Sequence, residues 1–378
     1  MNTIKLNTIG LNDVSLNYVG AKVRANSGGG GEDLAAIPFY VEAIEPLSAK
    51  FTNAHEYSRD NKTWTSANNE DIAVEAGQRV YFRATNEPGW NGIGKIQATN
   101  KYNVGGNIMS MLYGDGFAEN QTMKDSAFYY LFEGQTKLVS AKELKLVAME
   151  LMQRCYEGMF RGCTSLVDAP ELPATTLSYN CYQNLFFGCT SLVDAPELPA
   201  LEIKDSAYYS MFRGCTSLVV APKLKALKLY ENCYGYMFFG CTSLVVAPEL
   251  PALEVKSMAY QSMFNGCTSL TQAPELPATT LDSYCYQYTF ANCTSLVNAP
   301  ELPALELKSN CYKYMFQNCA SLKYVKAMFT TTPNDTYTSA WLSGVAANGT
   351  FVKNAAATWD VIGINGVPEG WTIETADA

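Results

Sequence analysis

The chain has 378 residues, with 27 Lys and Arg against 36 Asp and Glu, and a formal net charge of −9. This acidic balance excludes nucleic-acid binding through the phosphate backbone, which needs a basic patch that releases counterions. His55 is the only histidine, so multi-histidine metal sites are excluded, and a Ser-His-Asp or Cys-His catalytic arrangement could form only around it. No stretch reaches the roughly 18 apolar residues of a spanning helix, so we expect no membrane insertion.

The N-terminal segment predicts a small module on a flexible tether. Apolar and polar residues alternate over 1–24, with a turn at Asn12-Asp13, which is typical of a β-ribbon. A linker at 25–37 follows and contains four consecutive glycines. The ribbon is too small to fold alone, so we expect it to dock onto a scaffold or to form an oligomer. The N-terminus lacks the apolar core and cleavage site of a secretion signal, so we expect folding in the cytosol, where thiols stay reduced.

Residues 38–105 predict a small antiparallel β-domain. Turn residues at Asp60-Asn61 and at Glu75-Ala-Gly77 separate short runs of strand composition. The expected strands are 39–44, 49–52, 56–58, 63–65, 72–74 and 79–84. Five tryptophans lie outside the repeats described next, and we expect most of them to pack in small cores and caps: Trp64, Trp90, Trp341, Trp359 and Trp371.

The strongest signal is a 26-residue repeat within 106–326. The line Met-Phe-X-Gly-Cys-Thr-Ser-Leu, followed by Ala-Pro-X-Leu-Pro and Cys-Tyr, recurs with its phenylalanine at Phe160, Phe186, Phe212, Phe238, Phe264, Phe290 and Phe316. A degenerate copy with Phe132 stands 28 residues upstream, as expected for a repeat that caps a stack. The pattern dissolves after Leu322, so we expect 327–378 to form a C-terminal cap with strands.

Each repeat predicts one short strand and one helical segment, which is a helix or a helical turn. In one copy, residues 166–172 are extended, while apolar residues at 181, 182, 185, 186 and 189 cover an arc of about 140° on a helix. Neither element can bury its apolar face alone, so neighbouring repeats must stack with parallel strands about 4.8 Å apart. A proline in the extended segments limits these strands to two or three residues. The predicted fold class is a repeat solenoid of short parallel strands plus helical segments, preceded by a small β-domain.

The repeat resembles a known family. The line Leu-X-X-Ala-Pro-X-Leu-Pro…Cys-Tyr-X-X-Met-Phe-X-Gly-Cys-Thr-Ser-Leu is similar to the BspA-type leucine-rich repeat of bacterial surface proteins, although Ala-Pro replaces a β-branched strand residue. The resemblance covers about 127–324 and implies a leucine-rich repeat solenoid used for adhesion and ligand capture rather than catalysis. The flanks at 56–64 and 349–371 resemble segments that accompany such repeats in gut Bacteroidales and their phages.

All twelve cysteines lie in the repeats, in two columns. The first holds Cys163, Cys189, Cys215, Cys241, Cys267, Cys293 and Cys319, and the second holds Cys155, Cys181, Cys233, Cys285 and Cys311. Disulfides within a repeat do not explain the first column, because two copies have alanine in the second, and pairing between repeats leaves one of seven unpaired. No CxxC spacing or nearby histidine supports a metal site. We favour buried reduced thiols and predict no metal and no cofactor.

Two sets of side chains are candidates for ligand binding. Tyrosines that vary between copies should point outward and offer rigid rings with a polar tip: Tyr209, Tyr236, Tyr288 and Tyr314. Carboxylates form a column in the extended segments, interrupted by Lys223: Glu171, Glu197, Glu249, Glu275 and Glu301. This column could gather a hard cation such as calcium, or it could be a solvated face where Lys223 relieves repulsion, which we favour. The tyrosines of the Cys-Tyr pairs are expected to pack in the core.

These patterns predict a non-enzymatic binding protein, since no pair of carboxylates stands in an apolar setting that would tune it for acid–base catalysis. The expected partner is a cell-surface protein or glycan. We expect a phage virion surface protein, a fibre or receptor-binding component, attached to its scaffold through residues 1–24 and able to form a homo-oligomer. The alternative is a bacterial cell-surface adhesin of the BspA type.

Overall fold

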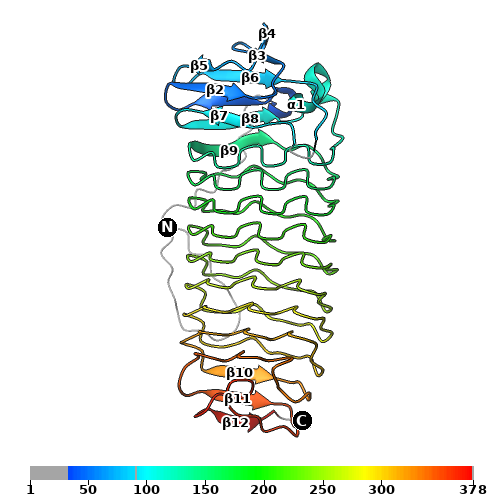
Figure 1. Cartoon of the computed structure of the whole chain (residues 1–378), viewed down its shortest axis with the longest axis vertical. Helices are drawn as coiled ribbons and strands as arrows, with labels where there is room; N and C mark the ends of the chain where they lie inside the picture. The colour runs from blue at the N-terminus through cyan, green and yellow to red at the C-terminus, as the bar shows by residue number, and fades with distance from the viewer. Residues whose placement is uncertain (1–32, 90–91, 377–378) are drawn as a thin grey trace, which may run out of the picture. The chain divides into compact units, whose positions relative to one another are not determined.

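The computed structural model describes residues 33–89 and 92–376 (Figure 1). The chain divides into two compact units, Met1–Asp33 and Leu34–Ala378, and all the helices and strands named below belong to the second. The predicted ribbon at 1–24, most of the linker at 25–37 and Trp90 lie outside the described residues.

Two sheets form the first part of this unit. Their strands are β1 (Tyr40–Ala43), β2 (Leu47–Phe51), β3 (Glu56–Ser58), β4 (Thr65–Ser66), β5 (Ile72–Val74), β6 (Arg79–Arg83), β7 (Ile96–Ala98), β8 (Tyr102–Asn107) and β9 (Leu138–Lys145). One sheet has the order β4-β3-β6-β1-β8-β9, and the other has the order β5-β2-β7. Apolar and polar residues alternate along the strands, so that one face of a strand is buried. In β6, Val80 and Phe82 are buried, and the other three residues are partly exposed. The six expected strands are present with small shifts at their ends, whereas β7 and β8 were not among them.

The first sheet continues into the repeats without a break. Strand β8 pairs antiparallel with β1 and parallel with β9, which belongs to the first, degenerate repeat. Gly105 in β8 allows this strand to pair closely with β1, because a Cβ at position 105 would collide with the ring of Tyr40. The segment between β8 and β9 holds α1 (Ser110–Tyr113) and the 3-10 helix η2 (Gly114–Ala118), and a second 3-10 helix, η1 (Leu34–Ala36), precedes β1. One hydrophobic core therefore runs through both regions.

The predicted helical segments of the repeats are wrong. In the described residues the only α-helix is α1, and each expected segment is instead a series of consecutive turns, here called a turn segment. The seven turn segments that are followed directly by a cysteine are 153–162, 179–188, 205–214, 231–240, 257–266, 283–292 and 309–318. Every fourth residue has a positive φ, as at Asn180 (57°), Asn184 (56°) and Gly188 (72°), which an α-helix does not allow.

Backbone hydrogen bonds alternate in direction along each turn segment. The N–H groups of Cys163 and Arg161 bond three residues back, to Phe160 and Gly158, and close turns within the repeat. The N–H groups between them point to the next repeat: Phe160 donates to Leu185, and Gly162 donates to Phe187. Alternate N–H groups of the turn segments thus bond to the next repeat. These bonds satisfy donors that would be buried and unpaired if each repeat formed turns only within itself.

The extended segments pair even more sparsely than expected. Successive repeats meet through isolated parallel bridges, such as Asp194 with Val220 and Val220 with Val246, rather than through strands of two or three residues. Proline has no N–H to donate, and each of these segments carries one or two prolines.

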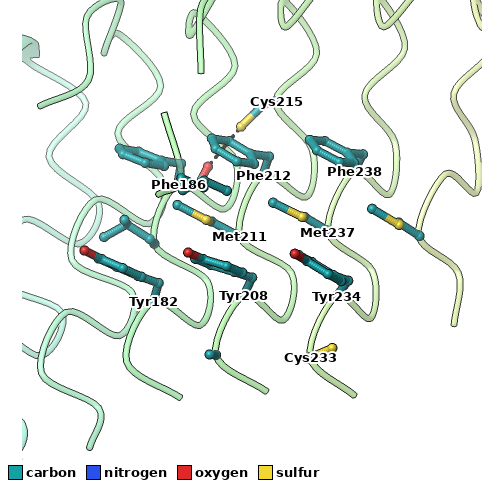
Figure 2. Close-up of a cluster of buried hydrophobic side chains, with 14 of the residues drawn as sticks. Tyr182, Phe186, Tyr208, Met211, Phe212, Cys215, Cys233, Tyr234, Met237 and Phe238 are labelled. Carbon is teal, nitrogen blue, oxygen red and sulfur yellow. Dashed lines mark hydrogen bonds between the residues drawn. The ribbon is translucent and has the colours of Figure 1, made fainter. Parts of the chain in front are cut away.

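Stacked side chains fill the interior of the repeats (Figure 2). Phenylalanine rings of neighbouring repeats lie face to face, for example Phe186 and Phe212 with centroids 5.5 Å apart and planes at 12°. The tyrosines of the Cys-Tyr pairs form a second stack, with Tyr182 and Tyr208 at 5.9 Å and 7°. The five apolar positions of the 181–189 segment are all buried, as predicted, although not on a helix.

The repeats end in a parallel sheet of β10 (Tyr324–Ala327), β11 (Thr350–Lys353) and β12 (Thr372–Thr375). Trp341 is fully buried at this end, where it stacks on Tyr312 and donates its indole N–H to the carbonyl of Gly366. Trp359 and Trp371 are also buried, as expected for a cap.

Candidate ligand-binding surface

The four variable tyrosines are all partly exposed and lie on the turn segments in two pairs. Tyr209 and Tyr236, from neighbouring repeats, have ring centroids 5.5 Å apart at 59°. Tyr288 and Tyr314 stack at 4.5 Å and 19°. Burial raises the pKa of Tyr209 and Tyr288, so their hydroxyls remain neutral donors at physiological pH.

Three of these tyrosines occupy a costly backbone conformation. Tyr236, Tyr288 and Tyr314 have φ values of 58°, 57° and 57°, in the left-handed region that bulky residues avoid. The equivalent position holds Gly158 in one repeat and Asn184 in another, the two residue types best suited to it.

Arginines and further aromatic side chains extend the tyrosine surface. We define the Arg–aromatic strip as Tyr130, Arg161, Phe187, Arg213, Tyr236 and Phe239, all partly exposed on turn segments. The Arg161 guanidinium lies 5.8 Å from the ring of Tyr130 and 5.2 Å from that of Phe187. The Arg213 guanidinium lies 5.4 Å from Phe187, 5.5 Å from Tyr236 and 4.6 Å from Phe239. Cations and rings therefore alternate from repeat to repeat, an arrangement stabilised by cation–π attraction.

The two arginines of the strip differ in their charge partners. Arg161 pairs with Glu133 at 3.2 Å. Arg213 forms no ion pair with any carboxylate in the described ranges 33–89 and 92–376. The faces of Phe187, Tyr236 and Phe239 attract its positive charge instead.

Most of the strip lay outside the sequence predictions. Arg161, Phe187, Arg213 and Phe239 all occupy the X position of Met-Phe-X-Gly-Cys, the most variable place in that line. That variability in a mostly uniform motif was the signal that could have found them.

The carboxylate column is exposed and partly neutralised. Lys145, Lys225 and Lys326 lie 3.7, 4.0 and 2.9 Å from Glu171, Glu197 and Glu301. Glu249 and Glu275 are also exposed. No group of three or more His, Cys, Asp or Glu side chains in the described part of the chain is arranged to hold a metal ion.

His55 stands in the β-domain, beside a polar hollow of about 450 Å³ that also contains Asn53, Asn68 and Asn86. Its Nδ1 accepts a hydrogen bond from the backbone N–H of Thr85, 3.3 Å away.

Comparison of the chain with protein-family models, with curated proteins and with solved structures finds no match. The resemblance to the BspA-type repeat therefore stays a prediction. Within the described ranges, no helix combines the length and apolar character needed to cross a lipid bilayer.

The cysteines are buried and free, and the first column is hydrogen-bonded. Each thiol there donates to the carbonyl oxygen of a phenylalanine in the preceding repeat, as Cys215 does to Phe186 at 3.1 Å (Figure 2). Burial raises the pKa of these thiols, to about 12 for Cys241. Unreactive thiols of this kind pack the interior rather than perform chemistry.

Proposed function

We propose that the chain is a non-enzymatic binding protein, in which a leucine-rich repeat solenoid presents the turn segments to a ligand. Stacked interior columns and bridges between repeats support the solenoid assignment. Such a scaffold is nearly uniform from repeat to repeat, so specificity resides in the few positions that vary. The turn segments hold the varied aromatic and cationic side chains.

The observation that carries this proposal is the left-handed conformation of Tyr236, Tyr288 and Tyr314. A residue held in a sparsely populated backbone region costs on the order of 1–3 kcal/mol, and such residues cluster at functional sites. Glycine or asparagine would relieve the cost, as other repeats demonstrate. Contact with a ligand would explain why three partly exposed tyrosines stand at these positions in place of glycine or asparagine.

The test uses the purified full chain on an array of immobilised mucin, plant and bacterial polysaccharides. The variant Tyr236→Asn places at this position the residue that Asn184 supplies two repeats earlier. We expect this variant to be no less stable than the wild type, because relief of the φ strain offsets the lost ring contacts. Binding to the array should fall, and adding Tyr314→Asn should lower it further.

A matched control is Tyr324→Asn, which removes an exposed tyrosine from the extended side of a repeat. This control should keep the array signal. Failure of the wild type to bind any polysaccharide, or equal binding by wild type and the Tyr236→Asn, Tyr314→Asn double variant, would contradict the proposal.

A further inference from the structure

The charged residues of the turn segments are sorted by position. From 179 to 318 there are six turn segments; Asp205 and Glu231 are the first residues of two of them, and the only other charged residues in the six are Arg213 and Lys313. These two are cations, although the whole chain carries −9. The carboxylate column lies in the extended segments instead. Beyond the first residue of each of these turn segments, the side chains therefore include two cations and no carboxylate.

Both cations are placed beside exposed aromatic rings. Arg213 is surrounded by Phe187, Tyr236 and Phe239, as described above. The Lys313 ammonium lies 5.3 Å from the ring of Tyr314, which is stacked on Tyr288. Like Arg213, Lys313 forms no ion pair within the described part of the chain. Each site thus offers an unpaired cation next to flat apolar surface.

The two sites lie on the same set of turn segments, four repeats apart. At about 4.8 Å per repeat, they are separated by roughly 19 Å along the stack. A small acid can occupy one of them, whereas an extended polymer with several acid groups can engage both and gain affinity from the second contact.

We infer that this surface binds a carboxylated polysaccharide, with uronate groups at Arg213 and Lys313 and sugar rings on the neighbouring aromatic faces. This inference rests on the proposed binding function of the turn segments. The planar guanidinium of Arg213 matches the two oxygens of a carboxylate. Tyrosine suits a sugar because its ring packs against the C–H face and its hydroxyl bonds to sugar hydroxyls. Recurrence of rings at the repeat spacing fits a ligand that is itself a regular polymer.

The experiment measures binding of the full chain to three named polymers by calorimetry or biolayer interferometry. These are polygalacturonate, its fully methyl-esterified form, which keeps the rings but lacks the charge, and polyglutamate, which keeps the carboxylates but lacks the sugar. Measurements at about 0.15 M salt screen the long-range field of the protein. We expect polygalacturonate to bind roughly tenfold or more tightly than either of the others, the effect of losing a charge-assisted hydrogen bond.

The decisive variant is Arg213→Gln with Lys313→Gln. Its matched control is Lys223→Gln with Lys323→Gln, which removes two exposed lysines from the extended segments of the same two repeats. The first variant should lose the preference for acid over ester, and the control should keep it. Equal loss in both variants would show that only net charge matters and would overturn the inference.

Other outcomes also decide the matter. Equal affinity of wild type for acid and ester, equal affinity for polyglutamate, or no binding to polygalacturonate would each overturn the carboxylated polysaccharide as ligand. If the ester binds as well as the acid and Tyr236→Asn weakens both, the binding function of the turn segments survives and only the acid selectivity fails. If Tyr236→Asn weakens neither, the proposed function fails as well.

Discussion

Replacing Tyr182 with phenylalanine should stabilise the protein. The hydroxyls of Tyr156, Tyr182 and Tyr208 are buried in three successive repeats and have no hydrogen-bond partner in the described chain. A buried hydroxyl without a partner costs about 1–3 kcal/mol of folding free energy. Tyr182→Phe removes this cost and keeps the ring, which stacks on Tyr156 at 5.8 Å and on Tyr208 at 5.9 Å. We therefore expect a gain of about 1–3 kcal/mol in the free energy of unfolding.

A matched control distinguishes this effect from a general benefit of phenylalanine. Tyr102 is equally buried, but its hydroxyl donates to Oε1 of Gln135 at 3.3 Å. Tyr102→Phe should therefore destabilise the protein by about 0.5–1.5 kcal/mol, the usual net value of a hydrogen bond.

Urea unfolding followed by tryptophan fluorescence measures both changes, and an unchanged slope against urea shows that the same structure unfolds. The two variants should shift the midpoint in opposite directions. If Tyr182→Phe lowers the midpoint as Tyr102→Phe does, the hydroxyl of Tyr182 has a partner in solution, and the reasoning from unsatisfied burial is refuted.

Further predictions concern the buried ion pair, the buried thiols and the particle that carries the protein. Glu157 is almost fully buried, and its carboxylate pairs with Arg154 at 2.8 Å. Arg154→Ala leaves this carboxylate unpaired, so it should lower the free energy of unfolding by about 3–5 kcal/mol. Adding Glu157→Gln should recover most of that loss. Desolvation raises the pKa of Glu157 above 4.5, so the folded protein binds this proton more tightly than the unfolded chain does. The free energy of unfolding therefore falls as pH rises from 4.5 through the raised pKa. Urea unfolding of Arg154→Ala should show a larger loss of stability at pH 7 than at pH 4. The twelve buried thiols should resist iodoacetamide at pH 8 in the folded protein and react after unfolding, and mass spectrometry counts the alkylated cysteines. Rapid alkylation of the native chain would contradict the raised pKa values of these thiols, which are about 12 for Cys181 and Cys233. Density-gradient fractions of a producing culture should contain the protein in phage particles, and enrichment in bacterial membranes would favour the cell-surface adhesin instead.

The burial of the repeat columns was predictable because a constant 26-residue period brings identical residues into register. Cys181, Tyr182 and Phe186 needed only that period and their apolar character to be assigned to the interior. The short strands at β3 and β5 were equally accessible, since turn residues bound each of them.

The local conformation of the turn segments was not predictable from apolar spacing alone. Tyr182 and Phe186 are four residues apart, which suits one face of an α-helix and also suits a chain that turns every four residues. The distinguishing residues are Asn180, Asn184 and Gly188, which tolerate a positive φ at that interval. The Arg–aromatic strip was not predicted for a different reason. The side chains at a variable position form a continuous surface only when neighbouring repeats lie side by side, and the sequence alone does not give that arrangement.

The alternating hydrogen bonds of the turn segments give the stack a direction. Each repeat donates N–H groups to the repeat that follows it, so a chain emerging from the ribosome always ends in unpaired donors until the next repeat is made. The last set is closed by the C-terminal cap, where Tyr312 and Phe316 donate to the carbonyls of Tyr337 and Trp341. Since every junction between repeats has the same pattern, a 26-residue unit can be duplicated or lost in a gene without disturbing either end. The length of the ligand-binding surface can therefore change in evolution in whole repeats.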